Sequence, residues 1–537
     1  MLQGRSIIGF GQGAGGTKAF HASEPRTGGP LPPEFLPATA AEIEAAVRLA
    51  HEAFASYGHL PGREKARFLR AIAANIESIA EEVIARAEQE TALPKARLQG
   101  EIARTCYQLR LFAQVVDEGS WINARIDRAD PDRKPQPRPD IRSLLRPLGP
   151  VVVFAPSNFP LAFSVAGGDT ASALAAGNPV VVKAHGAHPG TSELVGQAVQ
   201  KGARECGMPE GVFSLLFGSG TEVGTALVKH PRVKAVGFTG SRAGGRALMD
   251  LAAARPEPIP VYTEMSSTNP VFILPGALRK NGEAIAAGLY GSFTLGAGQF
   301  CTKPGLVFLP EGIDDAAFVA KLQQSVSDSG PFTLLTSGIR SSYREETAQR
   351  KHESAVAVLA EKPSPDGPEF NVGAALFATD ANSFLRDGDL EGEIFGPSTL
   401  LVRHARREQL LQIAAGLEGH LTATIHGTEQ DLHDFRELIA ILEDKVGRLV
   451  FNGFPTGVEV SHAIVHGGPY PATSDGRSTS VGSQAIFRFC RAICYQGFPD
   501  AALPAELKDA NPLGIWRMLD GEITKEPVTR PVAALAS

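Results

Sequence analysis

Cys301 stands in a segment that can present a reactive thiol. It follows the Gly-rich run LGAGQF and precedes Thr302, Lys303 and Pro304. A conformationally permissive run of this kind can place a thiol at the edge of a loop or helix. A single cysteine is also a common small core residue. The segment alone therefore leaves a nucleophile and an inert core thiol both open.

Two further polar residues follow apolar runs that are typical of strands. Glu264 ends the run PVYTE, which predicts its carboxylate at the mouth of a sheet, either facing a ligand or ending a solvated strand. Asn158 lies between two prolines in PSNFP, after the run VVVFA. Its amide is expected to be a fixed donor or to tie a turn.

The run FTGSRAGG has the composition of a strand-to-helix turn. Gly240 and Ser241 directly follow a predicted strand, and Gly245 lies at the opening of the next helix. Backbone N–H groups and a helix N-terminus in such a turn can face an anion. An ordinary turn without a ligand explains the same pattern.

The elements that must position these residues indicate an α/β protein. Helical spacing is expected over 39–54, with a capping box from Thr39 to Glu42, and again over 64–87 and 96–116. A Pro-rich charged stretch at 127–140 then forms a linker or excursion. From residue 150, Val-rich runs alternate with amphipathic segments, which predicts a parallel, doubly wound sheet, and a looser alternation from 265 to about 480 predicts a second α/β unit.

Composition excludes several classes of protein. The 537 residues are 43% hydrophobic and 20% charged, which is typical of a globular enzyme of two to four domains. The net charge of −6 is spread along the chain, so nucleic acid and membrane partners are not expected. The five cysteines have no spacing suited to zinc, so no metal is expected, and they fit a reducing, cytoplasmic location.

The order of these motifs resembles that of the NAD(P)-dependent aldehyde dehydrogenases. The resemblance covers nearly the whole chain and rests on PSNFP, NPVVVK, FTGSRAGG, TEMSS, GQFC and EIFGP. It implies a Rossmann-like cofactor domain formed by 1–130 and 151–263 and a catalytic α/β domain over 264–484. It also implies bridging segments at 131–150 and 485–500, and a homodimer or homotetramer.

The resemblance also implies a role for each motif residue. Cys301 corresponds to the nucleophile, Glu264 to the general base that activates water, and Asn158 to the oxyanion donor. Cofactor contacts fall on Lys183, Gly186, Gly240, Ser241, Gly245, Glu393 and Phe395. The sequence departs from the family at Ser157, where Trp is usual, and at Ser266 and Ser267, where two glycines are usual. A longer interval before Cys301 is consistent with an insertion around 276–283.

The cofactor is expected to be NADP, with NAD used less well. NAD-preferring relatives carry a Glu three residues after the cofactor lysine, and this chain has Gly186 in the run KAHG. No carboxylate then repels a 2′-phosphate, while Lys183, together with His185 or Ser219, can supply donors.

The aldehyde substrate is expected to be small and anionic. The C-terminal stretch from VFNGFP to CYQGFP resembles NADP-dependent 2,5-dioxovalerate dehydrogenases, and also fatty aldehyde dehydrogenases. Arg104 and Gln108 share one helix face where the family lines its substrate tunnel, and Phe159 is assigned there too. Because a buried guanidinium favours a carboxylate, we expect 2,5-dioxopentanoate to be oxidised to 2-oxoglutarate. Fatty aldehyde oxidation, a CoA-acylating reaction and a catalytically silent use of the fold remain the alternatives.

Overall fold

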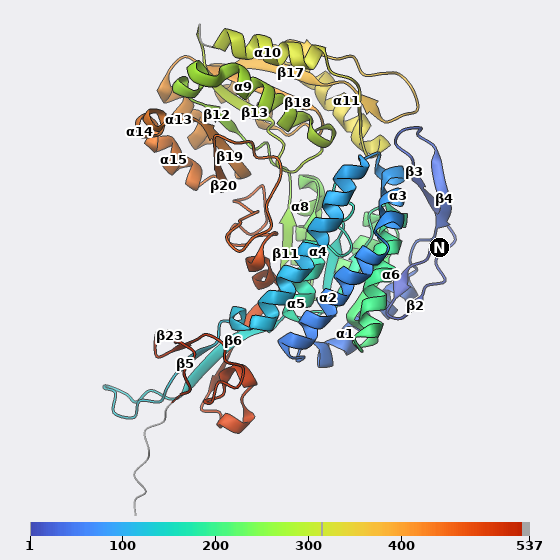
Figure 1. Ribbon diagram of the computed structural model, residues 1–537, viewed down its shortest axis with the longest axis vertical. Coiled ribbons are helices and arrows are strands. Elements are labelled where there is room, and N and C mark those ends of the chain that lie inside the picture. The colour runs from blue at the N-terminus through green and yellow to red at the C-terminus, as the bar shows by residue number, and fades with distance from the viewer. Residues whose placement is uncertain (1, 313–314, 529–537) are drawn as a thin grey trace, which may run out of the picture.

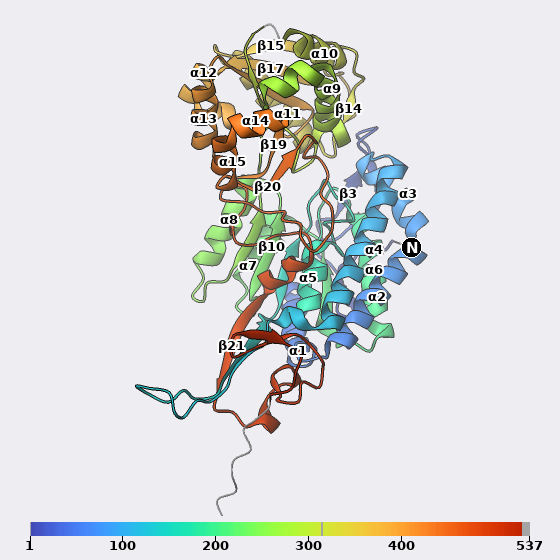
Figure 2. The same cartoon turned by 60° about the vertical axis from the view of Figure 1, so that its left-hand side comes forward.

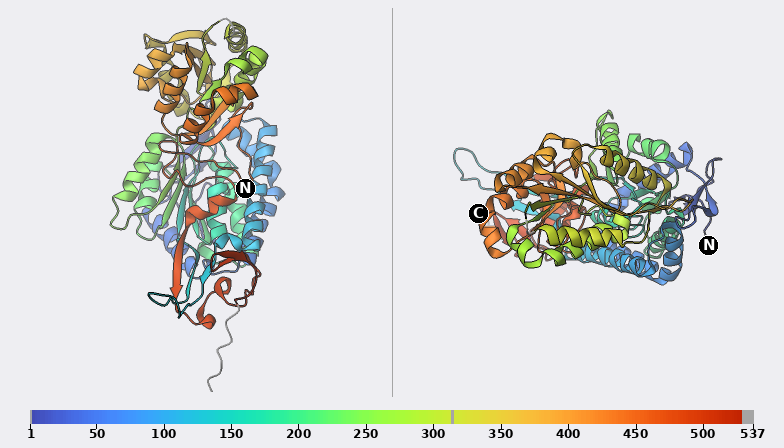
Figure 3. Two further views of the ribbon diagram at one scale, coloured as in Figure 1. Left: turned by 90° about the vertical axis from the view of Figure 1, so that its left-hand side faces the viewer. Right: turned by 90° about the horizontal axis from the view of Figure 1, so that it is seen from above.

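The computed structural model describes residues 2–312 and 315–528. Its longest axis carries three parts in series: an α/β unit in the middle, a second α/β unit at one end, and a small sheet that projects at the other (Figure 1). Figure 2 and the left view of Figure 3 show the same order. Within the described ranges, no helix is long and apolar enough to span a membrane.

The first α/β unit is built on a seven-stranded sheet in the order β11-β10-β7-β8-β9-β1-β2. Its five parallel strands, numbered along the chain, have the order 3-2-1-4-5 that defines a Rossmann-like sheet. The strand order reverses between β7 and β10, so a ligand crevice is expected at their carboxyl ends. The strands are β1 (Ile7–Ile8), β2 (Gly11–Gln12), β7 (Val151–Phe154), β8 (Val180–Lys183), β9 (Phe213–Leu216), β10 (Ala235–Thr239) and β11 (Val261–Glu264).

Helices cover both faces of this sheet. One face packs on α5 and α6 with α2 to α4 outside them, and the other on α1, α7 and α8. The helices are α1 (Ala40–Tyr57), α2 (Gly62–Ser78), α3 (Ala80–Thr91), α4 (Lys95–Glu118), α5 (Gly168–Ala176), α6 (Pro189–Glu205), α7 (Thr225–Lys229) and α8 (Arg242–Ala253). A hairpin of β3 (Phe20–Ser23) and β4 (Pro30–Phe35) lies beside them.

The predicted helices are present, with one correction. The capping box of Thr39 and Glu42 is confirmed at the start of α1. The prediction of a single helix over 64–87 is wrong, because Ile79 separates α2 from α3. Its φ and ψ angles of −118° and 18° are not helical. Apolar spacing continues across this break, so periodicity alone did not reveal it.

The second α/β unit has a seven-stranded sheet in the order β15-β17-β18-β13-β12-β19-β20, parallel except for β15. Its faces pack on α9 and α10 and on α12, α13 and α15. The strands are β12 (Val271–Ile273), β13 (Leu306–Pro310), β15 (Ala357–Glu361), β17 (Ala375–Asp380), β18 (Ser398–His404), β19 (His420–His426) and β20 (Val446–Phe451). The helices are α9 (Pro275–Thr294), α10 (Ala316–Ser327), α11 (Ser337–His352), α12 (Ala381–Arg386), α13 (Arg407–Gly416), α14 (Glu429–Asp434) and α15 (Arg436–Glu443). A two-stranded sheet of β14 (Phe332–Thr333) and β16 (Asn371–Val372) completes it. Helix α9 is interrupted at Asn281, inside the segment where an insertion was expected.

The projecting sheet has the order β21-β6-β5-β22-β23. At one edge of this sheet, β6 (Ile141–Pro147) and β21 (Cys490–Gln496) form an antiparallel pair, which brings together the two segments expected to bridge. It also contains β5 (Arg125–Asp127), β22 (Arg517–Leu519) and β23 (Glu522–Thr524). The sheet therefore extends beyond 131–150 and 485–500.

Candidate active site

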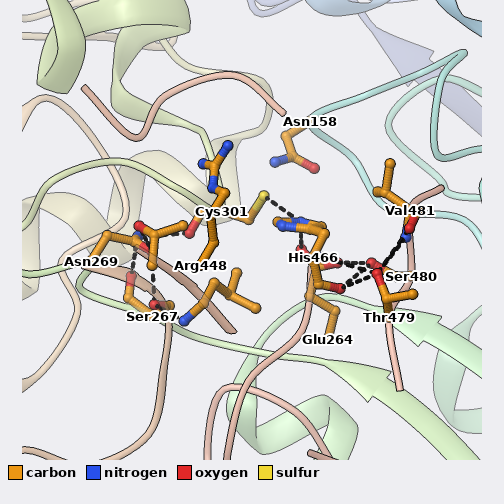
Figure 4. Close-up of polar contacts among 12 residues, drawn as sticks. Asn158, Glu264, Ser267, Asn269, Cys301, Arg448, His466, Thr479, Ser480 and Val481 are labelled. Atoms are coloured by element: carbon orange, nitrogen blue, oxygen red, sulfur yellow. Dashed lines mark hydrogen bonds and ion pairs between the residues drawn. The ribbon is translucent and has the colours of Figure 1, made fainter. Parts of the chain in front are cut away.

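Cys301, Glu264 and His466 meet between the two α/β units (Figure 4). Glu264 is the last residue of β11, and Cys301 follows the short 3₁₀ segment 295–298. His466 lies in the loop after β20. The Nε2 atom of His466 is 2.9 Å from Oε1 of Glu264 and 3.5 Å from Sγ of Cys301. The fold thus places an imidazole between the predicted nucleophile and the predicted base.

The loop that carries Cys301 is held by two specific features. Gly298 has a φ of +69°, and a Cβ at this position would come within 2.2 Å of the Gly396 carbonyl oxygen. Only glycine fits such a close approach. Asn269 then donates from Nδ2 to the carbonyl oxygens of Cys301 at 2.8 Å and Lys303 at 3.0 Å. These contacts fix the backbone on both sides of the thiol.

The surroundings of the two reactive groups move their pKa values in opposite directions. Burial and the neighbouring Glu264 charge raise the pKa of the Cys301 thiol well above its ordinary value. Burial also raises the pKa of Glu264, but the attraction and hydrogen bond of His466, with the hydrogen bond from Ser480, outweigh burial and lower it. Glu264 is therefore an ionised acceptor, and the Nε2 atom of His466 must carry the proton that it donates.

The predicted oxyanion residue lies beside the thiol. Asn158 is buried and donates one amide N–H to the Gln299 carbonyl at 3.0 Å, which leaves its second N–H for a ligand. The ring of Phe159 packs edge-on against Phe300, the residue before Cys301. The guanidinium of Arg97 lies 4.6 Å from the Phe159 ring centroid and supports this wall.

Arg104 and Gln108 have different surroundings although both lie on α4. The Nη1 atom of Arg104 donates to the Val458 carbonyl, whereas its Nε and Nη2 atoms are buried without a partner among the described residues. Its guanidinium lies 5.5 Å from the ring centroid of Phe163. Gln108 is fully buried and donates to the Ala162 carbonyl at 3.3 Å. The structure gives Arg104 a free edge near the site and packs Gln108 against the backbone of the first unit.

The turns at the carboxyl ends of β8 and β10 carry residues predicted to contact the cofactor. Lys183 ends β8 and is buried, which lowers its pKa to about 8. Gly186 is exposed, and a Cβ there would meet nothing within 4 Å. Ser241 is the N-cap of α8 and accepts from the Gly244 backbone N–H at 3.2 Å. A Cβ on Gly245 would come within 2.6 Å of the Met265 sulfur, so this glycine lets α8 approach the sheet.

Glu393 lies across from this turn in the second unit. It lines a cleft of about 260 Å³ together with Arg242, Ser266, Ser267, Glu418 and His420. Phe395 follows two residues later and is half-buried. The open space at Gly186, the N-terminus of α8 and the carboxylate in the cleft fit a nicotinamide dinucleotide laid across the two units.

The Cys301, Glu264 and His466 donor atoms all lie within 4.8 Å of one another. Thiolate, imidazole and carboxylate are ligands that Zn²⁺ accepts. The three residues come from separate parts of the chain, so no local spacing could show this donor set. We assign it to proton and thiol chemistry below and draw no role for a metal.

Several residues of the site were not identified from the sequence. His466, Asn269 and Lys303 carry no local motif, because each acts through contacts that only the fold creates. The GQFC motif predicts Cys301 as the nucleophile but gives no information on its partner 165 residues further along the chain. A histidine flanked by glycines and small residues in AIVHGGP was the only available signal.

The chain belongs to the aldehyde dehydrogenase family, whose family model matches residues 14–469. Members of this family oxidise aldehydes with NAD(P). The sequence is 49% identical over 522 residues to alpha-ketoglutaric semialdehyde dehydrogenase 2 of Azospirillum brasilense, covering 97% of this chain and 99% of the relative. It is 46% identical to an alpha-ketoglutaric semialdehyde dehydrogenase of Acinetobacter baylyi, covering 91% and 93%.

Solved structures confirm the fold. The lactaldehyde dehydrogenase of Escherichia coli matches with a TM-score of 0.79 at 22% identity, covering 92% of this chain and 98% of that one. A 1-pyrroline-5-carboxylate dehydrogenase matches with a TM-score of 0.77 at 20% identity, covering 92% of each chain. At this identity the likeness establishes the aldehyde dehydrogenase architecture and the Rossmann-like unit.

Proposed function

We propose that this chain oxidises 2,5-dioxopentanoate, the semialdehyde of 2-oxoglutarate, to 2-oxoglutarate and prefers NADP. The observation that supports this substrate is the Nε and Nη2 edge of Arg104, which is buried near Cys301 and has no partner among the described residues. Leaving such donors unsatisfied is costly, and a carboxylate satisfies both at once. The two relatives named for alpha-ketoglutaric semialdehyde support the same substrate.

The proposed reaction begins with the Cys301 thiol. The thiol loses its proton to solvent water, and the thiolate attacks the aldehyde carbon to form a tetrahedral adduct. The Nε2–H of His466 faces both the sulfur and Glu264, so it stabilises the negative charge before attack. The second N–H of Asn158 and the Cys301 backbone N–H stabilise the developing oxyanion.

Collapse of the adduct leaves a thioester on Cys301. When bound, the nicotinamide would supply the hydride acceptor. Glu264 then removes a proton from water, the hydroxyl attacks the thioester carbon, and the C–S bond breaks to release the acid and restore the thiol. A water-activating carboxylate of this kind argues against a CoA-acylating enzyme, and the assembled thiol, base and amide argue against a silent use of the fold.

The preference for NADP rests on Gly186. Lys183 supplies a cation at the end of β8, and Gly186 itself places no carboxylate in the exposed space beside it, where a 2′-phosphate would lie. Lys183, Gly186, Gly240, Ser241, Gly245, Glu393 and Phe395 would hold the dinucleotide. NAD is expected to serve with lower affinity because it lacks the phosphate.

The proposal also divides the chain into working parts. The Rossmann-like unit binds the cofactor, the second α/β unit carries the nucleophile, and the five-stranded sheet bridges protomers of a homodimer or homotetramer. Trp516, directly before β22, and Ile523 on β23 are 49% and 70% exposed, which is costly for an isolated chain. Light scattering of the purified protein tests the assembly.

A panel of aldehydes tests the activity. Initial rates with 2,5-dioxopentanoate, succinic semialdehyde, propanal and decanal should be measured with NADP and with NAD as cofactor reduction. We expect kcat/KM to be highest for 2,5-dioxopentanoate with NADP. A higher kcat/KM for decanal would favour a fatty aldehyde dehydrogenase, and acyl-CoA formation on addition of CoA would favour the acylating reaction.

A further inference from the structure

Lys303 is a fully buried lysine two residues after the nucleophile. Lys303 is 1% exposed, and its side chain is among the largest fully buried side chains of the described residues. Removing an ammonium group from water carries a penalty of several kcal/mol that close partners must offset. The mechanism proposed above makes no use of this charge.

The partners of Lys303 belong to the loop that carries Glu393 and Phe395. Its Nζ atom donates to the carbonyl oxygens of Ile394 at 2.7 Å and Ser398 at 3.1 Å. The Ile394 carbonyl lies inside the EIFGP motif, and Ser398 directly follows it. The lysine therefore ties the nucleophile loop to the EIFGP loop through one side chain.

A second contact joins the same two loops. The close approach of Gly298 to the Gly396 carbonyl, described above, leaves no room for a side chain between them. The backbone of Lys303 is itself anchored by Asn269. A hydrogen-bonded cation and a backbone contact thus fix the position of the EIFGP loop relative to the backbone around Cys301.

Charged groups of both signs surround Lys303. Glu393 and Glu346 attract it, whereas Arg350 opposes them, and burial lowers the pKa of Lys303 to about 8. Burial raises the pKa of Glu393 to about 7, and Lys303 is the main charge that opposes this rise. Glu393 is also held by Ser266 and the Ser267 backbone, while Glu346 on α11 repels it.

We infer that Lys303 is a positioning residue for the cofactor: it holds the EIFGP loop against the nucleophile loop and keeps the Glu393 carboxylate charged for the nicotinamide ribose hydroxyls. This inference rests on the proposed function, which assigns the ribose contact to Glu393. It adds a direct physical link between cofactor binding and the nucleophile. The link follows from the side-chain contacts of Lys303 in the fold.

The inference predicts a pH-dependent loss of cofactor affinity. In Lys303→Met the opposing cation is gone, so the pKa of Glu393 rises further and the carboxyl is protonated at neutral pH. A neutral carboxyl is a weaker acceptor, and we expect the Kd for NADP to rise about tenfold near pH 7.5. The loss should shrink toward about pH 9, because Glu393 ionises again in the variant and Lys303 loses its proton in the parent.

Titration calorimetry with NADP between about pH 6 and pH 9 measures this effect. The matched control is Lys65→Met, since Lys65 is another buried lysine whose pKa burial lowers to about 8, in a different core. It should lower thermal stability without shifting the pH profile of the Kd. If Lys303→Met does not fold, Lys303→Gln keeps a donor for the carbonyls and removes only the charge.

Glu393→Gln separates this inference from the proposed function. An unchanged Kd for NADP in Glu393→Gln would show that Glu393 does not contact the ribose, and the proposed role of Glu393 would then be wrong. Weaker NADP binding by Glu393→Gln together with unchanged NADP binding by Lys303→Met would overturn this inference and leave the proposed function standing. The inference would also be overturned if Lys303→Met lost NADP affinity equally at every pH and this loss added in full to the loss in Glu393→Gln. Support requires that the double variant binds NADP about as well as Glu393→Gln.

Discussion

The imidazole of His466 donates its Nε2 proton to Oε1 of Glu264 across 2.9 Å and places the same N–H 3.5 Å from the Cys301 sulfur. The other oxygen of Glu264 accepts from Ser480 at 2.8 Å, so the carboxylate is fixed at both ends. His466 is fully enclosed, and its backbone N–H donates to Thr479 Oγ1 at 2.9 Å. A thiolate that forms at Cys301 therefore has a donor already in place.

His466→Phe should lower kcat by about 10- to 100-fold, the scale of one lost hydrogen bond to a charged group. Phenylalanine keeps a ring of similar size but has no donor for the thiolate or for Glu264. Pre-steady-state kinetics should show that formation of the reduced cofactor becomes slow. An unchanged first turnover in a folded variant would show that the thiol needs no help from this residue.

Cys301→Ala should abolish oxidation of every aldehyde while NADP binding and thermal stability stay near those of the parent. The substitution removes the nucleophile and little buried volume. Cys106 and Cys206 are buried, and Cys494 is exposed but distant from the site elements, so each should tolerate Ser or Ala with small losses in rate. Turnover retained by Cys301→Ala would refute the thioester pathway.

Glu264→Gln should form one equivalent of NADPH per active site and then stall at the thioester, since no base remains to activate water. Rapid mixing with quenching, followed by mass measurement of the protein, should find the acyl adduct on Cys301. A normal steady-state rate without a burst would assign the base to another group.

The same variant tests the electrostatics of the thiol. Because the Glu264 charge contributes to the raised pKa of Cys301, removing it should lower that pKa and increase the thiolate fraction near neutral pH. Iodoacetamide should then alkylate Cys301 faster in Glu264→Gln than in the parent at about pH 7.5, and the difference should vanish at high pH. Cys494 serves as the internal control in the peptide map. Slower alkylation of Cys301 would show that Glu264 acts on the thiol mainly as its base.

The sequence predicted the elements well where local patterns decide them. The capping box at Thr39 and the Val-rich strands from residue 150 depend on short-range chemistry, and the structure has them in place. The break at Ile79 was missed because the apolar period runs through it. The participation of β5, β22 and β23 in the projecting sheet was missed because strands this short carry little alternation.

The candidate site shows the same division. Cys301, Glu264 and Asn158 stand in recognisable motifs, and the fold brings them together. His466 is 202 residues from Glu264, and Lys303 gains its importance only from carbonyl groups more than 90 residues away. A side chain that works through a distant backbone leaves no periodic or local signal. Such contacts require the three-dimensional structure.

Gly186→Glu should shift the cofactor preference toward NAD. A glutamate at this exposed position meets no steric conflict, since a Cβ there has nothing within 4 Å. Its carboxylate would accept from the adenosine ribose hydroxyls of NAD and repel a 2′-phosphate, so KM for NADP should rise about tenfold or more. Gly186→Gln is the control, because it adds the same bulk without charge. Equal use of NAD and NADP by the parent enzyme would contradict the preference itself.

Arg104→Leu should raise KM for 2,5-dioxopentanoate by about one to three orders of magnitude and spare propanal, because the lost guanidinium edge pairs only with a carboxylate. Arg104 also holds the Val458 carbonyl, so its loss could disturb the loop instead. Arg448→Leu controls for this, since Arg448 donates to the Gly457 and Pro455 carbonyls of the same loop with both of its terminal nitrogens. We expect Arg448→Leu to affect charged and uncharged aldehydes alike. If Arg104→Leu did the same, Arg104 would be a support of the loop, and the carboxylate would have to bind elsewhere.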